Sequence, residues 1–135
     1  MLYIGKDYFI KIQTINIKNM KNYDNFFFPS NDLKESKKFY SEVLEMPVKF
    51  DFSQQGMIAF KVGNEEPAII LKDKSKFPET KPCVWIEVNN VKEIYLKLKS
   101  KGVHFLSEPF KIKTGWAVEF TDPSGNQLGL ADYII

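Results

Sequence analysis

The sequence predicts an α+β fold made of two β-α-β-β-β repeats, whose curved mixed sheets surround a central cavity. Short runs of β-branched and aromatic residues between turn residues indicate strands, and two amphipathic stretches of helical period indicate helices. The order of elements in residues 25–72 begins again in residues 82–133. Such an internal repeat is typical of a duplicated structural unit.

The chain has 135 residues, of which 44% are hydrophobic, and this is enough for one domain with its own core. We expect a single domain over residues 25–135, a polar linker at 73–81 between the repeats, and an N-terminal arm at 1–24. Alternation at residues 8–13 predicts an extra strand in this arm, either along a sheet edge or across a dimer partner. A second interpretation of the arm, which stays open, is that the protein starts at Met20, because the domain pattern begins just after it.

In the first repeat, an aromatic strand at residues 26–28 is ended by Pro29, and Asn31 or Asp32 caps a helix that Pro47 stops. Three strands follow at residues 48–52, 57–62 and 68–71. The predicted apolar face of the helix comprises Leu33, Ser36, Tyr40, Val43 and Leu44.

In the second repeat, a strand at residues 84–88 leads to a helix that Asn90 caps and Gly102 ends. Further strands are expected at residues 103–106, 111–113, 116–121 and 127–131. A turn at residues 122–125 joins the last two, since Pro123 presets its backbone angle and Gly125 accepts a positive φ. The predicted apolar face of the helix comprises Val91, Ile94, Tyr95 and Leu98.

The two repeats correspond residue by residue. Residues 31–35 (NDLKE) match residues 89–93 (NNVKE) at the start of each helix. Along the strands, the matched pairs are Phe50 with Phe105, Phe60 with Glu119, and Ile70 with Gly129.

Composition excludes several classes of protein. A net charge of +2, with dispersed lysines, argues against a nucleic-acid partner. No apolar run is long enough to span a membrane, so no membrane partner is expected. The single cysteine, Cys83, rules out a disulfide within the chain and agrees with a cytoplasmic location.

Three motifs occur in order: residues 31–40 (NDLKESKKFY) with 43–46 (VLEM), residues 102–105 (GVHF), and residues 122–126 (DPSGN). On these motifs, residues 25–133 resemble the vicinal oxygen chelate superfamily, which includes glyoxalase I, fosfomycin-resistance proteins, extradiol dioxygenases and bleomycin-resistance proteins. The resemblance implies a homodimer, often with shared sites or exchanged strands.

The resemblance also implies where metal ligands would lie. The four positions at which the metal enzymes of the family carry His or carboxylate ligands correspond to Asn25, Ile70, Cys83 and Gly129. This set offers one neutral oxygen and one thiol, which is too little for a usual metal site. We therefore expect no metal and no other cofactor, and a character closest to the metal-free bleomycin-resistance-like members.

Strand alternation predicts which side chains face the cavity. Phe27, Phe60 and Trp85 are expected to form aromatic walls, with polar groups between them. The complete predicted set is Asn25, Phe27, Phe60, Cys83, Trp85, Glu87, Glu119 and Gln127.

These residues favour the binding or sequestration of a small flat or cationic organic ligand, by stacking and charge pairing. Two alternatives stay open. One is an enzyme, a glyoxalase-like lyase or dioxygenase, with relocated ligands (Cys83, Glu87 and Glu119) or with Glu119 or Glu87 as general base. The other is a ligand-free dimerisation module, in which Trp85 and Phe27 fill the interior.

Overall fold

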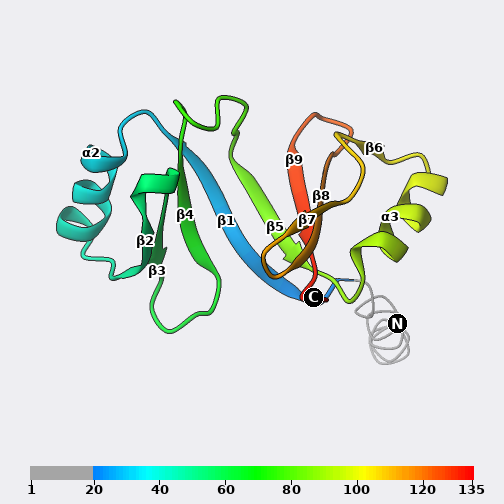
Figure 1. The fold of residues 1–135 in the computed structure, drawn as a ribbon, viewed down its shortest axis with the longest axis horizontal. Coiled ribbons are helices and arrows are strands. Elements are labelled where there is room, and N and C mark those ends of the chain that lie inside the picture. The colour runs from blue at the N-terminus through cyan, green and yellow to red at the C-terminus, as the bar shows by residue number, and fades with distance from the viewer. Residues whose placement is uncertain (1–19) are drawn as a thin grey trace, which may run out of the picture.

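The structure is a computed structural model that describes residues 20–135 of the chain. The strand predicted at residues 8–13 lies outside the described residues. Within them, the elements form one nine-stranded mixed sheet with a short helix for each repeat (Figure 1). No helix in this described part is long and apolar enough to cross a bilayer.

The first repeat runs from β1 to β4. Strand β1 (Asn22–Ser30) leads to helix α2 (Leu33–Lys38), which continues as a π-helical turn (Phe39–Val43). The strands that follow are β2 (Val48–Phe52), β3 (Met57–Lys61) and β4 (Ala68–Asp73).

The second repeat runs from β5 to β9. Strand β5 (Cys83–Glu87) leads to helix α3 (Val91–Ser100). The strands that follow are β6 (His104–Phe105), β7 (Phe110–Ile112), β8 (Gly115–Thr121) and β9 (Gln127–Ala131). The β-α-β-β-β repeats and the mixed sheet predicted from the sequence are confirmed.

The sheet has the strand order β2-β3-β4-β1-β5-β9-β8-β6, and β7 pairs with the free part of β8. Its centre is the antiparallel pair β1–β5, where the two repeats join. On either side the neighbouring pairs, β1–β4 and β5–β9, are parallel. Figure 1 shows α2 and α3 at the two ends of the sheet, so the strands between them leave one face without a helix.

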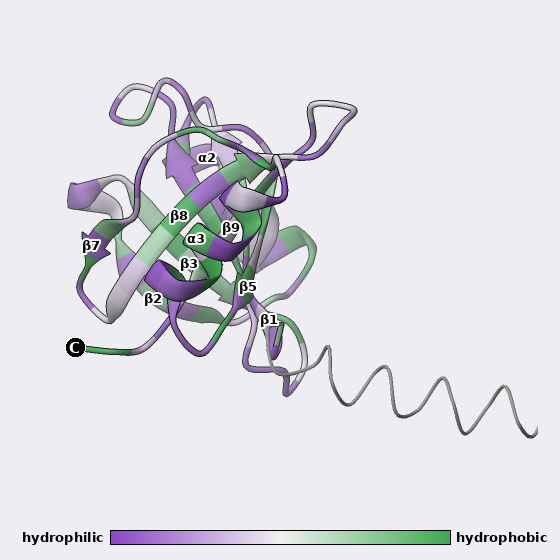
Figure 2. Ribbon diagram, turned by 90° about the vertical axis from the view of Figure 1, so that its right-hand side faces the viewer, coloured by the Kyte–Doolittle hydropathy of each residue, from purple (hydrophilic) through white to green (hydrophobic). Residues whose placement is uncertain are grey.

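Each helix covers the core of its own repeat. The cores contain Leu33, Ile58, Phe60 and Leu71 under α2, and Val91, Ile94, Val118 and Leu130 under α3. Figure 2 shows α3 lying over the strands of the second repeat. The predicted caps are confirmed, because Asp32 and Asn90 accept hydrogen bonds from the backbone N–H groups of Glu35 (3.0 Å) and Glu93 (3.1 Å).

Strand β1 is longer than predicted and includes Pro29. The strand pairs with β5 only as far as Phe27, so beyond this residue one of its edges carries no partner strand. A proline lacks the N–H group that a central strand position requires, and at this open edge that group is not needed.

The first helix also departs from the prediction at its end. Leu33 and Tyr40 pack against the core as expected, but Val43 is 65% exposed and Leu44 is 47% exposed. The π-helical turn over Phe39–Val43 widens the last turn, and this change of period rotates both side chains away from the sheet.

Candidate ligand-binding site

A cavity of about 310 Å³ opens on the face of the sheet that no helix covers. It lies where β1 and β4 end and where β5 and β9 begin. The segment at residues 76–81 forms one wall. The strand residues that line the cavity are Phe27, Lys72, Cys83, Trp85, Glu119 and Gln127.

Alternation along the strands brings these side chains to one face. In β4, Ile69 and Leu71 pack under α2, so Ile70 and Lys72 point to the opposite side. In β5, Ile86 packs under α3, which directs Cys83 and Trp85 into the cavity. The same rule places Glu119 opposite Val118 in β8.

Trp85 lies directly against the backbone of Gly129 on the neighbouring strand. A Cβ atom built on Gly129 would lie 2.4 Å from the indole Nε1 of Trp85, far inside van der Waals contact. Only glycine therefore allows the indole to lie flat across β9 at this position. Phe27 lies 5.1 Å from Trp85, centroid to centroid, and the two ring planes are tilted by 52°, so the rings form two adjoining faces of an aromatic wall.

Lys72 lies beside the aromatic wall, between two rings. Its Nζ is 5.5 Å from the ring centroid of Phe27 and 4.5 Å from that of Phe77. Burial lowers the pKa of Lys72, against the opposing effect of the charge on Glu119. Among the described residues, no carboxylate lies within ion-pair distance of this ammonium group.

Glu119 also lines the cavity, and its charge acts on Lys72. Its Oε2 accepts a hydrogen bond of 2.9 Å from the side-chain amide of Gln127. This bond orients the carboxylate between β8 and β9. The site thus contains both a cation and an oriented acceptor.

Cys83 is 7% exposed at the base of the cavity. Burial, followed by the negative charge of Glu119, raises the pKa of the Cys83 thiol to about 12. A hydrogen bond from Trp85 acts in the opposite direction but does not outweigh them. The thiol is therefore protonated at neutral pH and is a poor nucleophile or metal ligand.

Five of the eight predicted ligand-binding residues line this one cavity. They are Phe27, Cys83, Trp85, Glu119 and Gln127. Their shared face follows from correct alternation in β1, β5, β8 and β9.

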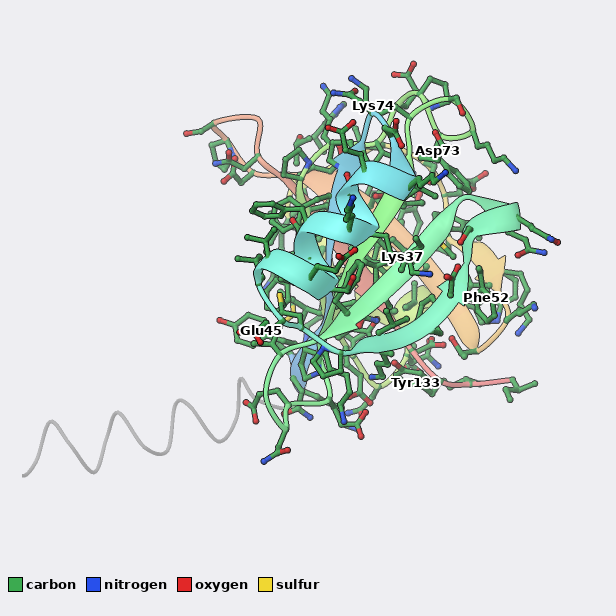
Figure 3. The ribbon with its side chains drawn as sticks, turned by 90° about the vertical axis from the view of Figure 1, so that its left-hand side faces the viewer. Lys37, Glu45, Phe52, Asp73, Lys74 and Tyr133 are labelled. Atoms are coloured by element: carbon green, nitrogen blue, oxygen red, sulfur yellow. The ribbon has the colours of Figure 1, made fainter. Side chains whose placement is uncertain are left out.

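Two predicted residues, Asn25 and Glu87, lie in a second cavity instead. This cavity, of about 550 Å³, is at the other end of the β1–β5 pair and is also lined by Tyr133. Figure 3 shows Tyr133 far from Asp73, which ends β4 near the first cavity. Asn25 accepts a hydrogen bond of 3.0 Å from the backbone of Ala68, and Glu87 forms an ion pair of 3.4 Å with Lys21.

The predicted place of Phe60 on the cavity wall is wrong. Phe60 is fully buried under α2 and stacks on Tyr40 at 5.0 Å. Ala59 pairs with Ile70 as Glu119 pairs with Gly129, so Ala59 is the counterpart of Glu119. The alignment that matched Phe60 with Glu119 is therefore displaced by one residue. A shift of one residue moves a side chain to the other face of the sheet.

The positions that hold metal in relatives do not fit a metal here. The amide oxygen of Asn25 is used by the backbone of Ala68, and the Cys83 thiol holds its proton. Ile70 has no donor atom, and the indole of Trp85 fills the space next to Gly129. The alternative ligand set of Cys83, Glu87 and Glu119 is also not brought together, because Glu87 lies in the second cavity. Within residues 20–135, no other cluster of three His, Cys, Asp or Glu residues replaces it.

Sequence reasoning missed Lys72 and the wall at residues 76–81. Strand alternation could have predicted Lys72, since it follows Ile70 by two residues and lies on the same face of β4. The wall at residues 76–81 could not be predicted, because residues 73–81 carry no periodic pattern and were expected only to link the repeats.

Comparison with known proteins agrees with this geometry. The family model described as Glyoxalase/Bleomycin resistance protein/Dioxygenase superfamily matches residues 22–130. No curated protein matches the sequence.

Several solved structures share the fold. Methylmalonyl-CoA epimerase from Mycobacterium tuberculosis is 18% identical, with a TM-score of 0.68 over 87% of this chain and 91% of that chain. A methylmalonyl-CoA epimerase variant from Streptomyces coelicolor is 15% identical, with a TM-score of 0.65 over 86% and 99%. A superfamily member from Vibrio splendidus is 15% identical, with a TM-score of 0.60 over 79% and 95%.

The family match extends over both repeats and includes the strands that line the cavity. The repeats, the mixed sheet and the solved structures agree with it. The chain belongs to the glyoxalase/bleomycin resistance protein/dioxygenase superfamily, the vicinal oxygen chelate fold.

Proposed function

We propose that this protein binds a small planar organic molecule in the cavity beside Trp85. The observation that carries the proposal is the aromatic wall of Phe27 and Trp85, which depends on Gly129 having no side chain. Flat aromatic faces stack on flat ligands. A cavity of about 310 Å³ is at the small end of the range for ligand pockets, which suits a compound of one or two rings.

The test is isothermal titration calorimetry with three two-ring compounds of different charge: 2-naphthoate, 2-naphthamide and 2-naphthylmethylamine. We expect at least one to bind with one site per chain. Trp85→Leu should weaken that binding about tenfold, because it removes the stacking surface.

Trp116→Phe is the matched control. Trp116 packs in the core under α3, so this variant should bind as the native protein does. Absence of measurable heat with all three compounds would contradict the proposal. Equal binding by native protein and folded Trp85→Leu would place the ligand elsewhere.

A catalytic role for Glu119 is a second candidate, since it is the predicted base that lies in this cavity. Its bond with Gln127 fixes the carboxylate, as a general base requires. Turnover of a carbonyl or glutathione-adduct substrate that Glu119→Gln abolishes would support it. The likeness to epimerases, at 15–18% identity, is one of fold and identifies no substrate.

We also propose that the chain forms a homodimer, as the family resemblance implies. Sedimentation equilibrium at micromolar concentration should give twice the monomer mass. A monomer mass over the whole concentration range would contradict this.

A further inference from the structure

The charges around the cavity differ from those predicted. The two carboxylates expected there, Glu87 and Glu119, favoured a cationic ligand, but Glu87 lies in the second cavity. Three lysines line the first cavity: Lys72, Lys76 and Lys81. The carboxylates that line it are Glu79 and Glu119. Among residues 20–135, the charge balance around the cavity is therefore positive, and Lys72 is the lining cation that lies over the ring of Phe27.

Lys72 differs from the other two lysines in its surroundings. Lys81 is exposed on the outer segment, and the Nζ of Lys76 donates a hydrogen bond to the backbone oxygen of Gln54. Lys72 is partly buried, and its ammonium group contacts the rings of Phe27 and Phe77. A buried cation is stabilised most by an anion that replaces its lost water.

Register shows how a ligand would span the site. Phe27 pairs with Ile70 in β4 and with Cys83 in β5, so Lys72 lies one step above Phe27 and Trp85 one step below it. Strands β4 and β5 flank β1, so their backbones are about 10 Å apart. An aromatic ring stacked on Trp85 beside Phe27 can therefore carry a substituent that reaches Lys72.

We propose that the ligand of this cavity is a planar aromatic acid, whose anionic group pairs with Lys72 while its ring stacks on Trp85 beside Phe27. This inference rests on the proposed function and names the chemical class of its ligand. Glu119, held by Gln127, also lines the cavity and would accept a hydrogen bond from a hydroxyl or amino group of the ligand.

Calorimetry with the same three compounds tests the charge. We expect 2-naphthoate to bind about tenfold more tightly than 2-naphthamide, since a charge-assisted hydrogen bond is about twice as strong as a neutral one. The amine should bind most weakly. In Lys72→Met the acid and the amide should bind within twofold of each other. The control Lys61→Met, which changes an exposed lysine of β3 outside the cavity, should keep the preference for the acid.

A second measurement uses the native protein and does not depend on how the variant folds. The pKa of Lys72, followed by NMR of ¹³C-methylated lysines, should rise when 2-naphthoate binds and stay constant with 2-naphthamide. An anion beside the ammonium group stabilises its charged form.

The outcomes separate the two proposals. Binding of the amide or the amine as tightly as the acid, or an unchanged Lys72 pKa in the acid complex, overturns the assignment of an aromatic acid and leaves planar binding in place. A preference for the acid that survives in Lys72→Met also overturns it. Failure of all three compounds to bind overturns both proposals.

Discussion

The contact between Gly129 and Trp85 shapes the cavity. The glycine here is required by space, because a methyl group would overlap the indole. The backbone angle is not the reason, since Gly129 is not among the positive-φ glycines. This single contact fixes the aromatic wall.

We expect Gly129→Ala to lower the free energy of unfolding by about 1–3 kcal/mol, because overpacking forces side chains from their preferred positions. It should also turn Trp85 away and weaken ligand binding. Urea denaturation measures the first effect, and the fluorescence of Trp85 in a Trp116→Phe background measures the second. The double variant Gly129→Ala/Trp85→Leu should lose less stability than the sum of the losses of the two single variants, because the smaller side chain relieves the overlap. A loss equal to that sum would contradict a direct contact between the two residues.

Cys83 gives a pH dependence. Its pKa is raised from 9.0 to about 12, so the folded state keeps the thiol protonated where the unfolded state ionises. The stabilisation is complete below pH 9 and is lost as the pH rises toward 12. Native protein should therefore lose about 1.4 kcal/mol of unfolding free energy at pH 10 relative to Cys83→Ala. Parallel pH curves for the two proteins, measured by urea denaturation, would contradict this.

At the scale of elements, Asp132 joins three parts of the second repeat. It is 1% exposed, and its carboxylate accepts backbone hydrogen bonds from Val91 (2.7 Å), Trp116 (2.8 Å) and Ile134 (3.2 Å). It therefore ties the start of α3 to β8 and to the end of β9. This role could not be predicted from the sequence, because a carboxylate after a strand resembles a surface residue.

Asp132→Ala should lower the free energy of unfolding by about 3 kcal/mol or more, since it leaves buried N–H groups without acceptors. Asp132→Asn should cost less, because it keeps one acceptor oxygen. The control is Asp122→Ala, whose carboxylate also accepts two backbone bonds but lies in an exposed turn. Equal losses for Asp132→Ala and Asp122→Ala in urea denaturation would show that burial does not set the cost.

Prediction from sequence worked where local periodicity and packing agree. The caps at Asp32 and Asn90 and the strand at 127–131 follow from patterns that the tertiary structure keeps. It failed where the backbone departs from a regular period, as in the π-helical turn before Leu44. The predicted position of Phe60 was wrong for a different reason, since a sequence match between the repeats carries no information on strand pairing.

At the scale of the whole molecule, the two ends of the uncovered face carry opposite charge. The cavity beside Trp85 has more lysines than carboxylates, whereas the second cavity contains Lys49 with Asp24, Glu65, Glu66 and Glu87. The net charge of +2 conceals this separation. An anionic ligand is therefore drawn to one end of the molecule.

Ligand binding should raise the stability of the whole domain. At a free concentration of 100 times the dissociation constant, 2-naphthoate should add about 2.7 kcal/mol and raise the melting temperature by several degrees. Lys72→Met at the same acid concentration should show a smaller rise. Equal rises in differential scanning calorimetry would indicate that the acid binds away from Lys72.

The indole resting on Gly129 also limits how this chain could change over generations. A carboxylate introduced at residue 129 by one substitution would overlap the indole of Trp85, so it could not be placed to bind a metal. Replacing Trp85 first would remove the stacking surface and leave residue 129 without a donor. Both positions must change before residue 129 can offer a donor atom, so no single substitution at either position creates a metal ligand here.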